Sequence, residues 1–102
     1  MHFLLFYDLV PDYAERRGQF RDAHLTKAWA AHNRGELLIA GALADPMDTA
    51  VLMFSTDSAA TVEAFARTDP YVTNGLVKSW RVRPWTTVTG AMATAPVHPS
   101  GS

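Results

Sequence analysis

Short apolar runs alternate along the chain with longer segments that have a helical period. Residues 2–9, HFLLFYDL, form the first run, and its length and its Phe and Tyr content predict a β-strand. Both alternating sides of this run are apolar, which indicates a central strand that is covered on both faces. Similar runs predict three more strands, over residues 36–43, 50–54 and 76–85. The segments between them carry turn signals: Asp45-Pro46 and Asn74-Gly75.

Residues 13–34 have the periodicity of one long amphipathic helix. At about 100° per residue, its apolar face combines small, aromatic and imidazole side chains. These are Phe20, His24, Leu25, Ala28, Ala31 and His32. Gly18 weakens the early part of the segment, so the helix is expected to start at Tyr13 or later. Gly35 is a natural stop signal.

A second, shorter helix is predicted to follow the third strand. Four polar residues are candidates for its N-cap: Ser55, Thr56, Asp57 and Ser58. Its apolar face would consist of Ala59, Val62, Phe65 and Ala66. Pro70 ends this helix, because the residue before a proline avoids helical backbone angles.

The resulting order, β-α-β-β-α-β, predicts an α+β fold of the ferredoxin-like type with a four-stranded antiparallel sheet. Two helices can cover only one face of such a sheet. The first strand is apolar on both faces, so the second face should not be exposed to water. We therefore expect a homodimer in which two sheets pack face to face.

Composition limits the size, the location and the partners of this protein. A chain of 102 residues with 48% apolar residues fits one domain. We place that domain at residues 1–90 and expect residues 91–102, which carry no charge unless His98 is protonated, to form a flexible tail. A net charge of −1 argues against a nucleic-acid partner. No apolar stretch approaches the roughly 20 residues of a membrane span, and the N-terminus lacks the features of a signal peptide.

Cysteine is absent, which excludes disulfides, thiol catalysis and thiolate metal sites in this chain. The same absence fits a reducing cytosol, and we expect a cytoplasmic protein. No pair of histidines has metal-ligand spacing with a carboxylate nearby, since His24 and His32 are eight residues apart. There is no glycine-rich phosphate loop either. We therefore expect neither a metal nor a cofactor.

His24 is the first candidate for chemistry, because a histidine within an apolar helical stripe needs a hydrogen-bond partner. Arg21 lies one turn before it, and Arg17 precedes that on the same side. An imidazole beside two guanidinium groups predicts a positive pocket that suits an anionic or enolate-like ligand. The alternative is a structural histidine that donates to a carbonyl.

Asp69 is the second candidate, and it ends the second helix on the inward side in the sequence Asp69-Pro70-Tyr71. Asp-Pro is also a common turn opener, which is the alternative interpretation. A ferredoxin-like fold brings its two helices side by side on one face of the sheet. Asp69 could then hold His24 in one tautomer and raise its basicity, as in general bases.

Other polar residues carry weaker signals. Asp8 closes the first strand and is interpreted either as a carboxylate at the rim of the site or as a solvated residue. His32 is a possible second inward group or a partner of the helix dipole. His2 and His98 are terminal and receive no role. The three tryptophans, Trp29, Trp80 and Trp85, are expected in the core or at the dimer interface.

Several segments together resemble the YciI-like (YCII-related) family between about Phe3 and Pro84. They are Arg21-Asp22-Ala23-His24-Leu25, Gly35-Glu36-Leu37-Leu38, Ala40-Gly41, Ser58 with Ala59 and Ala60, Asp69-Pro70-Tyr71 and Gly75-Leu76-Val77. The resemblance implies the dimeric α+β barrel, and it implies that His24 and Asp69 form a catalytic dyad. A characterised relative removes chloride from a chlorinated hydroxyhydroquinone. The chain has Gly41-Ala42-Leu43 where the family commonly has Gly-Pro, so the resemblance does not extend to the mouth of the pocket.

We therefore expect a cofactor-independent enzyme that acts on a small anionic molecule of cyclic or aromatic origin. His24, oriented by Asp69, would move a proton, in an elimination such as dehydrochlorination or in an isomerisation. Arg21, Arg17, Asp8 and Tyr71 are the expected substrate-binding residues. The alternative is a non-catalytic ligand-binding or accessory protein on the same scaffold. Cofactor-free oxygen chemistry is a third hypothesis, without distinctive support in the sequence.

Overall fold

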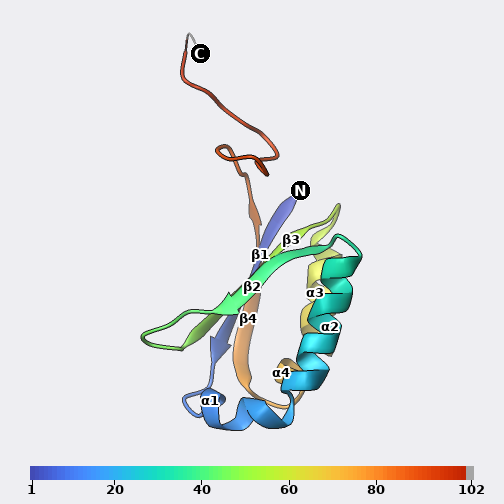
Figure 1. Ribbon diagram of the computed structural model, residues 1–102, viewed down its shortest axis with the longest axis vertical. Helices are drawn as coiled ribbons and strands as arrows, with labels where there is room; N and C mark the ends of the chain where they lie inside the picture. Colours follow the sequence, from blue (N-terminus) through green and yellow to red (C-terminus); the bar gives the residue numbers. More distant parts are fainter. Residues whose placement is uncertain (101–102) are drawn as a thin grey trace.

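The computed structural model describes residues 1–100 and has the expected ferredoxin-like α+β architecture (Figure 1). Its four strands form one antiparallel sheet in the order β2-β3-β1-β4. The strands are β1 (His2–Leu9), β2 (Leu37–Ala42), β3 (Thr49–Ser55) and β4 (Val77–Trp85). The predicted central position of the first strand is confirmed, because β1 lies between β3 and β4.

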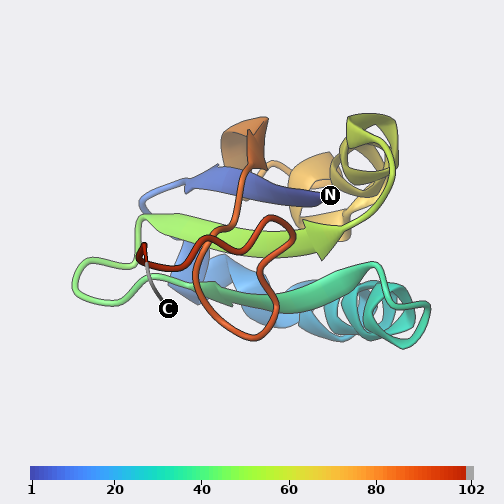
Figure 2. The same cartoon turned by 90° about the horizontal axis from the view of Figure 1, so that it is seen from above.

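Helices α2 (Arg21–Asn33) and α3 (Ala59–Thr68) lie along the same side of this sheet (Figures 1 and 2). Two single-turn helices, α1 (Tyr13–Arg16) and α4 (Pro70–Thr73), lie at one end of the sheet. Ser58 is the N-cap of α3, where its hydroxyl accepts a hydrogen bond from the backbone N–H of Ala60. Among the described residues, no helix combines the length and the apolar character that crossing a membrane requires.

The predicted helix over residues 13–34 is wrong in its first part, and the later start that Gly18 indicated is confirmed. The chain forms α1, then a 3₁₀ turn η1 (Arg17–Gln19), and enters α2 only at Arg21. Gly18 lies in the middle of this break, and a glycine costs about 1 kcal/mol in a helix interior relative to alanine. Figure 1 shows the chain changing direction here before α2 begins. The bend allows Tyr13 to be buried, and both Arg17 and Arg21 line the same cavity.

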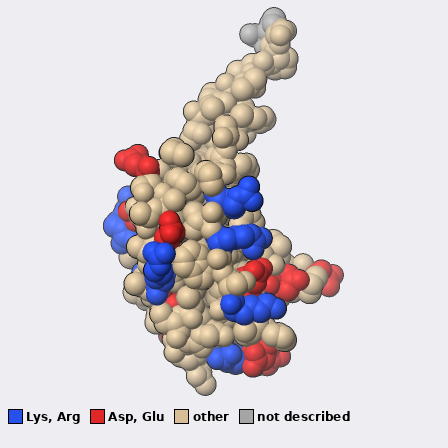
Figure 3. Space-filling model, turned by 180° about the vertical axis from the view of Figure 1, so that it is seen from behind, with Lys and Arg blue, Asp and Glu red and all other residues tan. Residues whose placement is uncertain are grey.

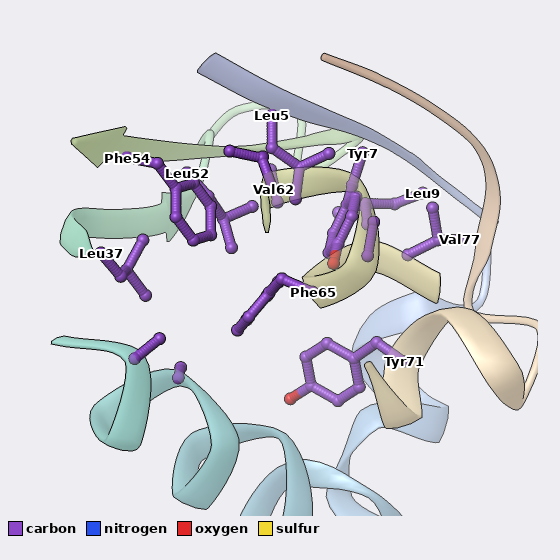
Figure 4. Close-up of a cluster of buried hydrophobic side chains, with 14 of the residues drawn as sticks. Leu5, Tyr7, Leu9, Leu37, Leu52, Phe54, Val62, Phe65, Tyr71 and Val77 are labelled. Carbon is purple, nitrogen blue, oxygen red and sulfur yellow. The ribbon is translucent and has the colours of Figure 1, made fainter. Parts of the chain in front are cut away.

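The core lies between the sheet and the helices (Figure 4). The odd-numbered residues of β1 face the helices and are at most 4% exposed: Phe3, Leu5, Tyr7 and Leu9. They pack with the inner residues of the other strands and with the apolar face of α3: Leu37, Leu52, Phe54, Val62, Phe65 and Ala66. The predicted burial of Val62, Phe65 and Ala66 is confirmed. Alternation along β1 thus orients Tyr7 toward the helical layer.

The opposite face of the sheet has no helix over it and is partly apolar. Leu4 and Phe6 of β1 are half-buried there and pair in register with Met53 and Val51 of β3. On the edge strand β2, Ile39 is 68% exposed. This apolar face is the surface on which the expected dimer depends.

Residues 86–100 follow β4 and extend away from the body, without charged side chains (Figures 1 and 3). The segment folds back on itself, since the backbone N–H of Ala95 donates to the carbonyl of Thr87 and that of Val97 donates to Val88. His2 is buried, and its Nδ1 lies 2.8 Å from the Thr87 hydroxyl. His2 therefore contacts the base of this segment. The flexibility expected for residues 91–102 stays a prediction, and its last two residues lie outside the described part.

Candidate active site

Asp69 occupies the junction between α3 and α4, where the chain is extended because Pro70 follows. Pro70 takes the first position of α4, which suits its fixed backbone angle. The Asp69 side chain is fully buried and accepts a hydrogen bond from the backbone N–H of Tyr71 at 3.0 Å. The carboxylate therefore caps α4. The turn-forming interpretation of Asp69 is thus realised in the structure, and it coexists with further contacts.

His24, in the first turns of α2, is held by this carboxylate. Its Nδ1 lies 2.8 Å from Oδ1 of Asp69 and 3.0 Å from Oδ2. An ionised carboxylate can only accept, so Nδ1 carries the hydrogen, and Nε2 is the basic nitrogen when the imidazole is neutral. The structure brings together the two residues that the sequence singled out.

Tyr7 is a third member of this cluster, and the sequence indicated only that it belongs to a central strand covered on both faces. Its hydroxyl donates to Oδ2 of Asp69 at 2.7 Å. Burial, followed by the charge of Asp69 and the hydrogen bond to it, raises the pKa of Tyr7. The phenol therefore keeps its proton and remains a donor. The signal available in the sequence was a tyrosine on the inward side of a central strand, where its hydroxyl requires a partner.

Tyr71 packs flat against His24, with ring centroids 3.9 Å apart and an interplanar angle of 12°. The ring of Tyr13 packs edge-on against the ring of Tyr71, with centroids 5.6 Å apart. Burial, together with the neighbouring Tyr13, raises the pKa of Tyr71 to about 12, although Arg21 and Arg17 act in the opposite direction. The imidazole is therefore fixed by a hydrogen bond at one nitrogen and by an aromatic face.

A cavity of about 360 Å³ opens beside this cluster, between α2 and the strands β2 and β3. Five polar residues line the cavity near His24: Tyr7, which is buried, Tyr13, Tyr71, Arg17 and Arg21. The strands contribute apolar side chains, including Leu37, Ala50 and Leu52. The His24 side chain is 13% exposed, so it is accessible from the cavity. The site combines a histidine–carboxylate pair, two cations and a largely apolar wall.

Asp8 does not reach this site, in contrast to its expected role at the rim. It accepts hydrogen bonds from Ser79 at 2.6 Å and from Arg81 at 3.4 Å. Successive residues of a strand point to opposite faces, so an inward Tyr7 places Asp8 on the helix-free face. Its predicted contact with the substrate is therefore withdrawn.

His32 and Trp29 lie at the end of the cavity away from Asp69. The His32 Nδ1–H donates to the carbonyl of Leu37 at 2.8 Å, and His32 lies in the last turn of α2. Trp29 meets His32 edge-on and is 60% exposed, so it is not a core residue of the single chain. Trp85 is also exposed, and Trp80 is half-buried against the core.

Residues 1–100 contain no group of three or more histidine, aspartate or glutamate side chains that could hold a metal ion. The side chains that the described cavity presents carry imidazole, phenol and guanidinium groups, with the carboxylate of Asp69 behind His24. Two imidazoles line the cavity, and His24 is the one that is paired with a carboxylate.

The fold and the cavity together define a ferredoxin-like α+β protein with a buried histidine–carboxylate pair beside a cationic pocket. The chain belongs to the YCII-related domain family, whose model matches residues 1–86. No curated protein matches the chain.

Among solved structures, the chain is similar to 5-chloro-2-hydroxyhydroquinone dehydrochlorinase (TftG) from Burkholderia phenoliruptrix AC1100, in complex with 2,5-dihydroxybenzoquinone. The sequences are 21% identical, the TM-score is 0.72, and the match covers 85% of this chain and 95% of that chain. At this identity the likeness establishes the common fold.

Proposed function

We propose that this protein is a cofactor-independent enzyme that performs acid–base chemistry on a small anionic molecule of cyclic or aromatic origin. The observation that carries the proposal is the 2.8 Å contact between Nδ1 of His24 and the buried carboxylate of Asp69, at the wall of a cavity. A base that is oriented in this way contributes roughly 10²–10⁴-fold to a proton transfer.

Each polar group at the cavity has a role in this proposal. His24 accepts the substrate proton at Nε2, and Asp69 stabilises the imidazolium that forms. Arg21 and Arg17 hold the negative oxygen of the substrate, since guanidinium groups bind oxyanions strongly in a poorly solvated site. Tyr71 supplies an aromatic surface beside the base, which suits a planar substrate.

The reaction that we propose is an elimination, with dehydrochlorination of a chlorinated hydroquinone as the first candidate. His24 takes the proton of a ring hydroxyl in the keto tautomer of the substrate. The electrons of that O–H bond form a carbonyl, the ring double bonds shift, and chloride leaves with the electrons of the C–Cl bond. The sum is the loss of HCl, so no external oxidant is required. The fold shared with a dehydrochlorinase supports this choice, and an isomerisation uses the same base.

The test is a panel of chlorinated and unchlorinated hydroxyhydroquinones, catechols and small lactones, incubated with the wild type and with His24→Asn. Chloride release and mass spectrometry report turnover, and a thermal-shift measurement reports binding. We expect the wild type to convert at least one compound and His24→Asn to convert it at least about 100-fold more slowly. Circular dichroism must show that the variant is folded.

Turnover that persists in a folded His24→Asn protein contradicts the acid–base role. The second candidate function, a non-catalytic ligand-binding protein, is favoured by the observation that Asp69 also caps α4 and binds Tyr7. That function predicts a ligand that stabilises the wild type and the variant equally and is recovered unchanged.

We further propose that the protein forms a homodimer through the helix-free face of its sheet. The apolar residues of this face that are at least partly exposed support the proposal: Leu4, Phe6, Ile39 and Val51. Exposed apolar patches of this kind mark protein interaction sites, and a two-fold axis pairs such a face with its own copy.

A further inference from the structure

We propose that Tyr7 is a positioning residue that sets the proton affinity of the His24–Asp69 pair through the carboxylate. The hydroxyl of Tyr7 and Nδ1 of His24 both donate to Asp69, from two different elements of the fold. The consequence for catalysis rests on the proposed function, whereas the effect on protonation does not.

The geometry of Asp69 supports this role. The carboxylate is fully buried and receives three donors, the Tyr7 hydroxyl at 2.7 Å, the Tyr71 N–H at 3.0 Å and the His24 Nδ1–H at 2.8 Å. A buried carboxylate is stable in its charged form only when its lone pairs are satisfied. Tyr7 supplies the shortest of these hydrogen bonds. Its hydroxyl therefore stabilises the negative charge of the Asp69 carboxylate directly.

Tyr7 acts from behind the carboxylate. Its side chain is 1% exposed, and its hydroxyl is engaged with Oδ2. Figure 4 shows the Tyr7 hydroxyl directed from the sheet toward the helical layer. The phenol therefore influences the base through Asp69, which places it outside direct contact with the reacting atoms.

The other charged and titratable groups around the imidazole come from four elements. α1 and η1 contribute Tyr13 and Arg17, α2 contributes Arg21, and α4 contributes Tyr71. The cavity residues of β2 and β3 are apolar. Both arginines disfavour the imidazolium, so the balance of protonation depends on how strongly Asp69 attracts the proton on His24.

Removal of the Tyr7 hydroxyl leaves the negative charge of Asp69 less compensated. The His24–Asp69 pair then binds an added proton more tightly, whether that proton resides on His24 or on Asp69. We therefore expect the Tyr7→Phe protein to take up this proton at a higher pH than the wild type.

The direct test is an NMR titration of the His24 imidazole in the wild type and in Tyr7→Phe, with His24→Asn used for assignment. We expect the midpoint to move to higher pH by roughly half a unit to one unit. Tyr13→Phe is the matched control, because it removes another phenolic hydroxyl of the same cavity, and the Tyr13 hydroxyl does not hydrogen-bond to Asp69. An unchanged midpoint in folded Tyr7→Phe overturns the proposal.

A second substitution keeps the test decisive if Tyr7→Phe does not fold. Incorporation of 3-fluorotyrosine at position 7 preserves the size of the ring and makes the hydroxyl a stronger donor. The titration midpoint should then move to lower pH, opposite to the effect of phenylalanine. A midpoint that does not move, or that moves upward, contradicts the proposal.

Activity supplies an independent readout. In Tyr7→Phe, the acid limb of the pH profile of kcat should move to higher pH by the same amount, with little change in KM. A profile that falls uniformly at every pH indicates a structural role and overturns the proposal. If the wild type converts no compound, the proposed function fails, while the NMR titration still decides the role of Tyr7.

Discussion

Asp69 accepts a hydrogen bond from the backbone N–H of Tyr71, and the ring of Tyr71 packs flat against His24. The same carboxylate also holds Nδ1 of that imidazole. One buried side chain thus fixes the histidine twice, directly and through the aromatic ring beside it. This arrangement couples the stability of the junction between α3 and α4 to the orientation of the base.

Asp69→Asn and Asp69→Ala should separate the structural role of this residue from its chemical one. Asparagine still caps α4, because its carbonyl oxygen can accept from Tyr71, whereas alanine removes the cap and leaves the buried Tyr7 hydroxyl without its partner. We expect alanine to lower the free energy of unfolding by about 2 kcal/mol or more. The asparagine variant should be the more stable of the two, as measured by urea unfolding.

The two Asp69 variants should differ less in activity than in stability. An amide does not stabilise the imidazolium, so Asp69→Asn is expected to reduce kcat by at least about 100-fold although the protein is folded. Chloride release under saturating substrate measures this effect. A folded Asp69→Asn protein with wild-type kcat would show that Asp69 is only a cap.

Arg21→Gln should weaken the binding of anionic substrates. The variant removes one of two guanidinium groups at the cavity while it keeps a polar side chain. We expect KM to rise by about 10-fold, corresponding to about 1.4 kcal/mol, with a smaller change in kcat.

The dependence of KM on salt should be weaker in Arg21→Gln than in the wild type. Arg34→Gln is the control, because Arg34 pairs with Glu36 at the far end of α2 and does not line the cavity. Equal losses in both variants would argue against a specific anion contact at Arg21.

The folded protein should lose stability at alkaline pH. Burial raises the pKa of Tyr71 to about 12 and also raises that of Tyr7, so both phenols stay protonated after the unfolded chain has ionised near 10. The native state then binds more protons than the unfolded state, and stability falls with rising pH. For Tyr71 this loss develops between about pH 10 and 12.

Urea unfolding at pH 8, 9, 10 and 11 measures this effect. Each phenol that stays protonated in the folded protein but ionises in the unfolded chain lowers the free energy of unfolding by at most about 1.4 kcal/mol per pH unit. Tyr71→Phe should show a shallower decline above pH 10, whatever its stability at pH 8. A slope identical to that of the wild type would indicate that Tyr71 ionises freely in the folded protein.

Val51→Glu should dissociate the proposed dimer. Val51 lies on the helix-free face of the sheet beside Phe6 and Gly41, so a glutamate there would place a charge in the interface. Size-exclusion chromatography with light scattering should show a dimer for the wild type and a monomer for the variant. Ala30→Glu, on the exposed face of α2, should leave the mass unchanged. A monomeric wild type refutes the dimer.

Much of the fold was predictable because its signals are local. The length and the aromatic content of the first apolar run identified β1 with its observed bounds, and four N-cap candidates that include Ser58, together with Pro70, marked the two ends of α3. The break at Gly18 was visible only as a weakness in the pattern. A single glycine costs about 1 kcal/mol, which tertiary contacts can either override or use, so the propensity alone did not decide between a continuous and a bent helix.

The candidate site was predictable in part, for a related reason. The helical period placed His24 on an inward face, and the order of elements placed Asp69 near it. Asp8 was misplaced although the alternation of β1 contained the answer, since its neighbour Tyr7 belongs to the inward set. The role of Tyr7 itself was missed, because a buried tyrosine in a strand satisfies every requirement of a core residue.

The sequence by itself determined the four strands and the two main helices, their order, and which face of each is apolar, because these depend on neighbours within a few residues. The tertiary structure decided the partners of the buried polar groups. Tyr7 and Asp69 are 62 residues apart, and His2 and Thr87 are 85 apart. Such contacts form only when the strand register and the helix positions are correct to within about an ångström. A hydrogen bond is lost after a displacement that hydrophobic packing still tolerates. No local pattern specifies positions that closely.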